Sequence, residues 1–427
     1  MSLVSGRSLA SHTRALSLCV ALSMPLGAEG ASATAASAEQ TAAGAPLTPP
    51  TGTTPPFVLQ GDNGDNRIQF GTLIHTDGRL AIGDDEERVL NTWQLRRLRA
   101  IVQGKVARHF DYFLNVDLAG GVVNVRDAYL DTVFSPAFRL RAGKARVPFS
   151  YDRNQLLSQI LFVERGLTTA VAPDRDTGVV VMGDLAHGRV SYATSFTNGV
   201  VDGGSSDLDT NDGKDLAGRL ILHPWATRPK SHLSGMGAAI AANTGEQGGA
   251  LPAFQTPGRH TFFAYAPGVV GSGRRTRWSP QVFYAHGRFW GYAEYVRSRG
   301  SVQRDGITGD VDHQAWQTAA SWVLTGETAP ERNVRPAVNF DPPSRHFGAL
   351  QVAGRVERLW VDRAALDRQL TTASSSQSAT VWTAGLNWYP NPYIKWVLNF
   401  DRSVFDKSGS APRHPEHTLA VRAQLGF

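Results

Sequence analysis

The sequence has almost no cysteine and no long apolar run after its first thirty residues. Its single cysteine, Cys19, lies inside the apolar segment 15–26, and no small residue precedes it as one would precede a lipidated cysteine. The chain beyond that segment therefore offers no thiol for a disulfide, a thiolate metal site or a cysteine nucleophile. No later segment approaches the roughly 20 apolar residues of a transmembrane helix, which argues against a helical membrane protein.

Lysine is also scarce, although the net charge is +6. It occurs only at positions 105, 144, 214, 230, 395 and 407, so arginine supplies most of the positive charge. Charged residues are 19% of the chain, aromatic residues are 9%, and glycine occurs 43 times, a composition that favours an all-β protein. The arginines recur one or two per apolar segment rather than in one basic cluster, which favours small anions over nucleic acid as partners.

The N-terminal 56 residues are expected to form no part of the folded domain. Arg7, His12 and Arg14 precede the apolar run and a tract of small residues follows it, so residues 1–38 are predicted to be a cleaved signal peptide. Residues 39–56 are rich in Pro, Thr, Gly and Ala and are predicted to be a flexible linker. Order is expected from residue 57 to residue 427.

Residues 57–427 consist of segments of about ten residues that alternate in polarity, the length a tilted strand needs to cross a membrane. In the last segment Leu419, Val421 and Leu425 share one face, whereas Thr418 and Arg422 lie on the other. About sixteen such segments can be placed, an even number that suits a closed barrel. We therefore predict an all-β fold, a transmembrane antiparallel β-barrel of about 16 strands in a Gram-negative outer membrane, in contact with lipid and lipopolysaccharide.

The lengths of the connections support this prediction, because they alternate along the chain. Short connections are predicted at 108–111, 135–137, 186–189, 286–288 and 390–392, and long ones at 77–91, 145–175, 198–214, 245–274 and 300–313. Two connections break the alternation, the tight Gly120-Gly121 and the long 326–346. A β-sandwich or propeller would not pair short turns with long loops in this way. The aromatic C-terminus, Phe427, is expected to be recognised by the barrel assembly machinery.

An anion path is the sharpest functional hypothesis that these segments support. A guanidinium is always charged and donates in a fork that fits phosphate or carboxylate, and rings of basic residues are how pores select anions. The predicted lumen-facing basic residues are Arg97, Arg99, Lys105, Arg139, Arg141, Arg219, Arg277, Arg355 and Arg422. The alternative is that this basic wall only shapes the field of a general porin, with Asp117, Asp127, Glu294 and Asp401 neutralising part of it.

The longest connection in the first half, around residues 146–176, is the candidate constriction loop. It carries the candidate constriction residues Arg146, Arg153, Arg165 and Arg175. Four acidic residues of the same segment, at positions 152, 164, 174 and 176, nearly balance this charge. The alternative is an exposed surface loop with solvated ion pairs.

The motifs for other chemistry are incomplete. Segment 207–213 has the oxygen density of a calcium loop, but it has Asp212 where such a loop needs Gly and Gly218 where it needs Glu. Neither a metal nor a cofactor is expected. Ser279, His223 and His286 lie in no recognisable nucleophile motif, so an enzyme is not expected, although a barrel enzyme or a structural membrane protein remains the alternative of a different class.

Several of these segments, in their order, resemble the phosphate-selective porin O and P family. They are FVLQ (57–60), LRRLR (95–99), DAYL (127–130), RAGKARVPF (141–149), FVER (162–165), PDRDTGV (173–179), KDLAGRL (214–220), TPGRHTFF (256–263), SPQ (279–281), AEYV (293–296), LTGE (324–327) and GLNWY (385–389). The resemblance implies a sixteen-stranded barrel, usually a homotrimer, through which anions such as phosphate or polyphosphate diffuse passively. It carries this role to Arg97, Arg99, Arg141 and Arg219. The phosphate-trapping members are rich in lysine at the constriction, whereas this chain is not.

Overall fold

The computed structural model describes residues 57–61, 63–82, 91–207, 209, 212–329, 331, 333–406 and 413–427. The predicted signal peptide, 1–38, and the predicted linker, 39–56, lie outside the described residues, so their boundaries stay predictions. Within the described part of the chain, no helix is long and apolar enough to cross a membrane.

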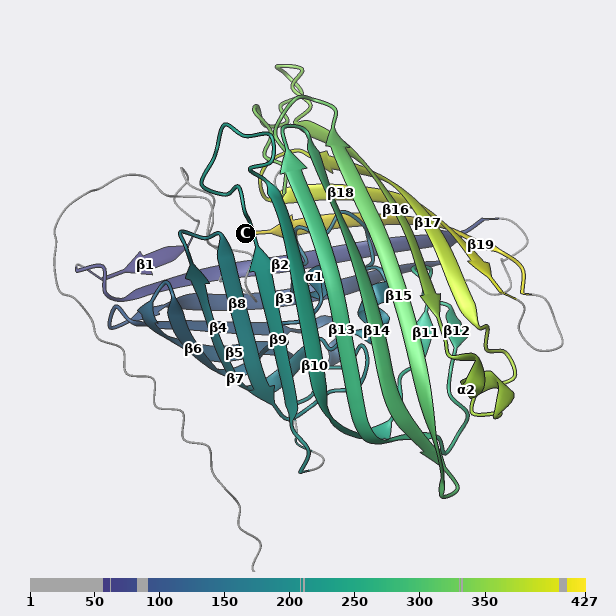
Figure 1. Ribbon diagram of the computed structural model, residues 1–427. Coiled ribbons are helices and arrows are strands. Elements are labelled where there is room, and N and C mark those ends of the chain that lie inside the picture. The colour runs from purple at the N-terminus through teal and green to yellow at the C-terminus, as the bar shows by residue number, and fades with distance from the viewer. Residues whose placement is uncertain are drawn as a thin grey trace, which may run out of the picture. The chain divides into compact units, whose positions relative to one another are not determined.

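Sixteen of the described strands pair antiparallel and close into a barrel, as predicted (Figure 1). They are β2 (Arg67–Ala81), β3 (Thr92–Val106), β4 (Phe110–Asp117), β5 (Asn124–Ser135), β6 (Phe138–Arg146), β7 (Arg175–Leu185), β8 (Val190–Thr197), β9 (Asp215–Leu222), β10 (Met236–Ala250), β13 (Val270–His286), β14 (Phe289–Arg304), β15 (Ile307–Val323), β16 (Ala349–Trp360), β17 (Ser378–Tyr389), β18 (Ile394–Phe405) and β19 (Glu416–Gly426). Each pairs with the next, and β19 closes the ring on β2. The short β1 (Val58–Gln60) pairs with the start of β2.

Burial in this barrel is the reverse of burial in a soluble protein. Polar side chains such as Gln281, Asn387 and Arg422 are buried towards the lumen, whereas large apolar side chains such as Trp382 and Phe400 are exposed on the outside. The period-two pattern of each strand produces this separation, because successive side chains point to opposite faces. An apolar outside and a polar inside are what a barrel in a lipid bilayer requires.

Short connections gather at one end of the barrel, the turn rim, and long ones at the other, the loop rim. The long connection 326–346 nevertheless belongs to the turn rim, because Ala329 N–H donates to Gly287 O at 2.7 Å and Phe340 N–H donates to Pro390 O at 2.7 Å. The prediction of a long connection at 300–313 is wrong. Strands β14 and β15 continue through it and reverse at Asp305 and Gly306, whose φ values of 51° and 79° suit a tight hairpin.

Two loops from the loop rim fold into the lumen. The lumen loop, residues 147–174, carries α1 (Tyr151–Asn154) and η2 (Leu167–Val171), and η2 contacts β14, β15 and β16. The loop 251–269 carries β11 (Phe254–Gln255) and β12 (Thr261–Phe263). Its Phe262 and Phe263 are fully buried in an apolar cluster with residues of β14, β16 and the connection 361–377, which contains α2 (Arg363–Asp367). This part of the lumen is filled by apolar packing, so the polar interior lies elsewhere.

Candidate functional site: an arginine-lined cavity in the lumen

The lumen loop is attached to the wall opposite its own strands by carboxylates. Glu294 of β14 accepts hydrogen bonds from the N–H groups of Tyr151 and Asp152, at 2.7 and 3.3 Å, and from Thr168 Oγ1 at 3.2 Å. Glu357 of β16 accepts one from Leu167 N–H at 2.6 Å. Buried carboxylates are costly unless donors satisfy them, and here the loop backbone provides those donors. The loop is therefore held across the lumen rather than lying on the surface.

Further wall residues fix the middle of the lumen loop. Side chains of β18 and β19 hold its backbone, through Lys395 Nζ to Ile160 O at 2.7 Å, Asn399 Oδ1 to Val163 N–H at 2.6 Å, and Gln424 Nε2 to Ser158 O at 3.0 Å. Because these bonds go to the loop backbone, they position the loop largely independently of its side chains. The loop is thus tied to β18 and β19 as well as to β14 and β16.

A cavity of about 370 Å³ lies between the lumen loop, the strand β3 and the loops 198–214 and 251–269. Its lining among the described residues includes only three carboxylates, from Glu164, Asp174 and Asp202. Nine arginines line the same space: Arg96, Arg97, Arg99, Arg126, Arg146, Arg153, Arg165, Arg175 and Arg259. All four arginines predicted on the loop segment and two of those predicted on the wall therefore meet in one cavity with a large excess of positive charge.

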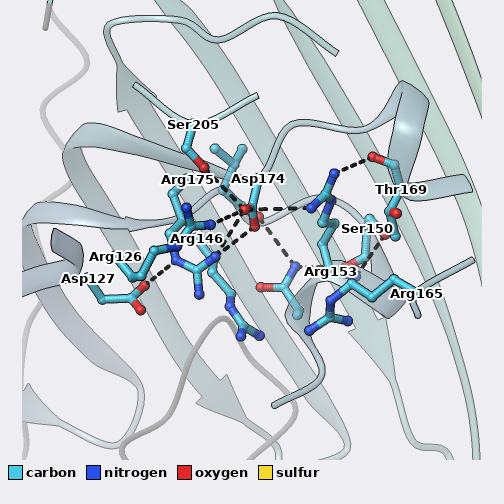
Figure 2. A network of polar contacts seen from close by, with 12 residues as sticks. Arg126, Asp127, Arg146, Ser150, Arg153, Arg165, Thr169, Asp174, Arg175 and Ser205 are labelled. Carbon is cyan, nitrogen blue, oxygen red and sulfur yellow. Dashed lines mark hydrogen bonds and ion pairs between the residues drawn. The ribbon is translucent and has the colours of Figure 1, made fainter. Parts of the chain in front are cut away.

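Asp174, at the end of the lumen loop, gathers several of these cations (Figure 2). Its carboxylate lies 2.8 Å from Arg126 Nη2, 3.0 Å from Arg175 Nη1 and 3.6 Å from Arg153 Nη1, and it accepts a hydrogen bond from Ser205 Oγ at 3.1 Å. Burial alone would raise the pKa of Asp174, but the neighbouring guanidinium groups outweigh it and lower the pKa well below its usual value. This carboxylate is a permanent counter-charge that ties the loop to the wall.

Three arginines of the cavity have no such partner. In the described part of the chain, no carboxylate forms an ion pair with Arg97, Arg146 or Arg259. Arg97 Nη1 donates to His75 Nδ1 at 3.1 Å, and Arg146 Nη1 donates to Gln155 O at 2.7 Å. Their positive charge is therefore available to a ligand, and a guanidinium donates in a planar fork that suits anionic oxygens.

Two of the arginines that the sequence did not reveal as lumen residues lie at β-bulges. Between β2 and β3, His75 pairs with Arg97 and Thr76 pairs with Leu95, which leaves Arg96 as the extra residue of β3. In β5, Arg126 is the extra residue in the same way, because Asn115 pairs with Asp127 and Val116 with Val125. A bulge interrupts strict alternation, so neighbouring residues can both face the lumen. The third, Arg259, follows a turn in which its N–H donates to Thr256 O at 2.8 Å.

The other predicted basic residues lie outside this cavity. Arg141, Arg277, Arg355 and Arg422 are buried and ion-paired, with Asp131 at 2.7 Å, Asp202 at 2.7 Å, Glu357 at 3.1 Å and Asp77 at 2.7 Å respectively. Arg219 donates to Gln281 at 3.0 Å on the wall behind the lumen loop. Lys105 and Arg139 lie near the turn rim, where Lys105 is 3.6 Å from Asp111.

Of the four acidic residues expected to neutralise the wall, two lie beside the cavity and two lie away from it. Asp117 pairs with Arg99 at 2.9 Å and Asp127 with Arg175 at 2.8 Å, so both offset charge beside the cavity. Asp401 accepts a hydrogen bond from Thr383 at 2.6 Å, and Glu294 holds the lumen loop. Neutralisation is therefore local, and it leaves the three arginines named above uncompensated.

The weaker candidates are not brought together. Ser279 Oγ donates to Glu294 on the lumen wall, whereas His286 lies at the turn rim beside His232. His223 contacts the ring of Phe283, further along β13. Residues 208, 210 and 211 of the acidic segment 207–213 lie outside the described residues. Among the described residues, no three His, Cys, Asp or Glu side chains are grouped to hold a metal ion.

A closed antiparallel barrel with an apolar outside and a charged lumen narrowed by an internal loop defines an outer-membrane porin. The chain belongs to the phosphate-selective porin O and P family, whose model matches residues 68–427, and the resemblance seen in the sequence is confirmed. Family and fold indicate a channel rather than an enzyme and place the protein in the Gram-negative outer membrane. Among curated proteins, none matches the sequence significantly.

Solved structures share the fold at low sequence identity. The outer membrane channel DcaP of Acinetobacter baumannii has a TM-score of 0.56 and 10% identity, over 86% of this chain and 99% of that one. An anion-selective porin from Comamonas acidovorans has a TM-score of 0.56 and 10% identity, over 85% and 100%. The trimer form of OmpT from Vibrio cholerae has a TM-score of 0.54 and 10% identity, over 85% and 99%.

Proposed function

We propose that this porin lets small anions, phosphate or polyphosphate among them, diffuse passively through the arginine-lined cavity. The observation that carries the proposal is the set of Arg97, Arg146 and Arg259, which line a cavity in the lumen and form no ion pair with a carboxylate of the described residues. An anion entering there exchanges part of its hydration for guanidinium donors. A small cation meets an excess of like charge and is repelled.

The arrangement suits passage as well as binding. Arg96, Arg97 and Arg99 follow one another along β3 and line the same cavity as Arg153 and Arg165 of the lumen loop, so an anion can pass from one donor to the next. A series of adjacent sites of moderate strength allows release, whereas one very strong site would trap the ion. The Comamonas acidovorans porin that shares this fold is anion-selective, which agrees with the proposal.

A general porin for small hydrophilic solutes is the second candidate. It is favoured by the ion pairs of Arg141, Arg277 and Arg422, which neutralise the lumen wall away from the cavity. In that case the cavity would bias the field without selecting anions. The two candidates differ in the sign and size of the selectivity of the purified channel.

The proposed partners follow from the barrel. The family and the trimeric Vibrio cholerae structure support a homotrimer, with lipid and lipopolysaccharide around its apolar outside. Phe427 exchanges backbone hydrogen bonds with Thr72, at 3.1 and 3.2 Å, and its ring lies 5.4 Å from that of Phe57. The last residue thus takes part in closing the barrel, which fits recognition of this segment by the barrel assembly machinery.

Recording from the purified protein in planar bilayers tests the proposal. A chloride gradient gives the reversal potential, and phosphate added to the chloride solution shows whether phosphate competes for the path. We expect a reversal potential on the anion-selective side and a reduction of the chloride current by phosphate. Cation selectivity would refute the anion path, and weak selectivity without any effect of phosphate would favour the general porin.

A further inference from the structure

Glu164 is the cavity carboxylate that reaches from the middle of the lumen loop to two arginines of the barrel wall. Glu164, in the middle of the lumen loop, extends towards the wall, where its Oε1 atom lies 2.6 Å from Arg79 Nη2 and 3.2 Å from Arg96 Nε. Arg79 belongs to β2 and Arg96 is the bulge residue of β3, so the two donors come from neighbouring strands. A single oxygen held by two guanidinium groups has the contacts that an oxygen of a bound anion would have.

From these contacts we propose that Glu164 is a tethered counter-anion, which occupies the wall subsite between Arg79 and Arg96 and thereby limits how strongly the cavity binds permeating anions. This inference rests on the proposed function and adds a specificity-determining residue to it. A free anion must either displace the carboxylate or bind at Arg97 beside it.

The loop backbone at Glu164 is held without its carboxylate. Arg355 Nη1 donates to Glu164 O at 3.0 Å, Val163 N–H donates to Asn399 Oδ1, and Arg165 Nη1 lies 2.9 Å from Asp152. Removing the side-chain charge therefore leaves the anchors of this part of the loop in place. Asp174 differs, because its carboxylate itself binds Arg126 of β5, Arg175 of β7 and Ser205 Oγ, so its removal would loosen the loop as well as change the charge.

The charge of Glu164 persists at the working pH of a porin. Burial would raise the pKa of Glu164, but Arg96, Arg97 and Arg79 outweigh burial and lower the pKa far below its usual value. The side chain is 16% exposed, so it lies at the edge of the cavity rather than deep in the wall. A permanent negative charge at this position competes with every anion that enters.

The test compares two variants of the full-length porin in planar bilayers. Glu164→Gln removes the charge and keeps the size, and Asp305→Asn makes the same charge change in the hairpin between β14 and β15, where the side chain is 86% exposed. We expect Glu164→Gln to lower the phosphate concentration that halves the chloride current by roughly three- to tenfold, and to shift the reversal potential further towards anions. Asp305→Asn should change neither.

The outcomes separate this inference from the proposed function. If the wild-type porin is anion-selective and Glu164→Gln leaves both measurements unchanged, the tethered counter-anion is refuted and the anion path stands. The same shift from Asp305→Asn would refute it too, because the effect would then be one of net charge. A cation-selective wild type refutes the anion path itself. Two controls assign the effect to the charge of Glu164. The folded variant should migrate in unheated gels as the wild type does, and Glu164→Asp should restore the wild-type phosphate concentration that halves the chloride current.

Discussion

Whether a lumen arginine serves selectivity or stability should depend on whether a carboxylate already neutralises it. Arg97 and Arg141 make a direct comparison, since both are buried arginines that point inward from the wall. Arg97 lines the cavity and contacts only His75 among the described hydrogen-bond partners. Arg141 binds Asp131 through two hydrogen bonds of 2.7 and 2.8 Å and lies 3.7 Å from the centre of the Tyr129 ring.

Arg97→Ala should mainly change selectivity. A unit charge about 6 Å from a passing ion in water contributes roughly 0.7 kcal/mol, which is about threefold in local ion concentration. Because anions lose this enrichment and cations lose the matching exclusion, the anion-to-cation permeability ratio should fall by up to about tenfold at low salt, and by less at high salt. Loss of the bond to His75 should cost about 1 to 3 kcal/mol of unfolding free energy.

Arg141→Ala should mainly change stability. It leaves Asp131 buried without a partner, which typically costs about 3 to 5 kcal/mol, whereas removal of both residues costs less. The assays are the reversal potential in a chloride gradient and the denaturant midpoint of the refolded barrel for Arg97→Ala, Arg141→Ala and Arg141→Ala with Asp131→Ala. Equal shifts of the reversal potential in the two single variants would refute the reasoning, because neutralised arginines would then contribute as much as uncompensated ones.

Two further outcomes follow from the loop. Glu294→Gln should loosen the lumen loop, because an amide cannot accept all the hydrogen bonds that the carboxylate accepts. We expect larger open-channel noise in this variant and no such increase in the turn-rim variant Glu327→Gln. A steady current in Glu294→Gln would contradict the anchoring role. The difference in anion preference between the wild type and Glu164→Gln should stay constant from pH 7 to about 4.5, because the lowered pKa values of Glu164 and Asp174 keep both carboxylates charged. These two carboxylates should stabilise the folded barrel fully above a pH of about 4, which is their pKa in the unfolded chain. This stabilisation should be lost as the pH falls through their lower pKa values in the folded protein. Selectivity of the two proteins measured at stepwise lower pH would contradict this if the difference between them already narrowed between pH 7 and 5.

The sequence was sufficient for the barrel because the period-two pattern is a direct consequence of strand geometry. In β19, the alternation of Leu419 and Val421 with Thr418 and Arg422 appears in the structure as outward and inward faces. The pattern misleads at 300–313, where polar residues are typical of a loop. There the outward charges pair across strands, as Arg299 does with Asp310 at 3.4 Å, so the strands continue beyond the apolar zone.

The candidate site was only partly predictable, for two physical reasons. A β-bulge depends on the register between two strands, so nothing in the alternation around Arg96 or Arg126 indicates that these side chains share the cavity. Ion pairing depends on cross-strand neighbours, so the sequence could not separate Arg141, which lies opposite Asp131, from Arg97, which lies opposite His75. Arg153 and Arg165 lie on the lumen loop, and Arg146 and Arg175 are the strand residues at its two ends, so all four were predictable from one long connection.

The uncompensated arginines also indicate where the path through the lumen lies. Arg97 and Arg146 are buried, and a buried charge without a partner costs several kcal/mol in a dry interior unless water or an anion solvates it. The cavity between β3 and the lumen loop must therefore be wet. On the side of β14 and β16, Phe254, Phe262 and Phe263 pack into an apolar cluster, which offers an ion no polar partner. In the proposed function, an ion that crosses the loop rim would pass along the arginines of β3, and the loop 251–269 would contribute to selectivity by filling the remaining lumen as well as by placing Arg259.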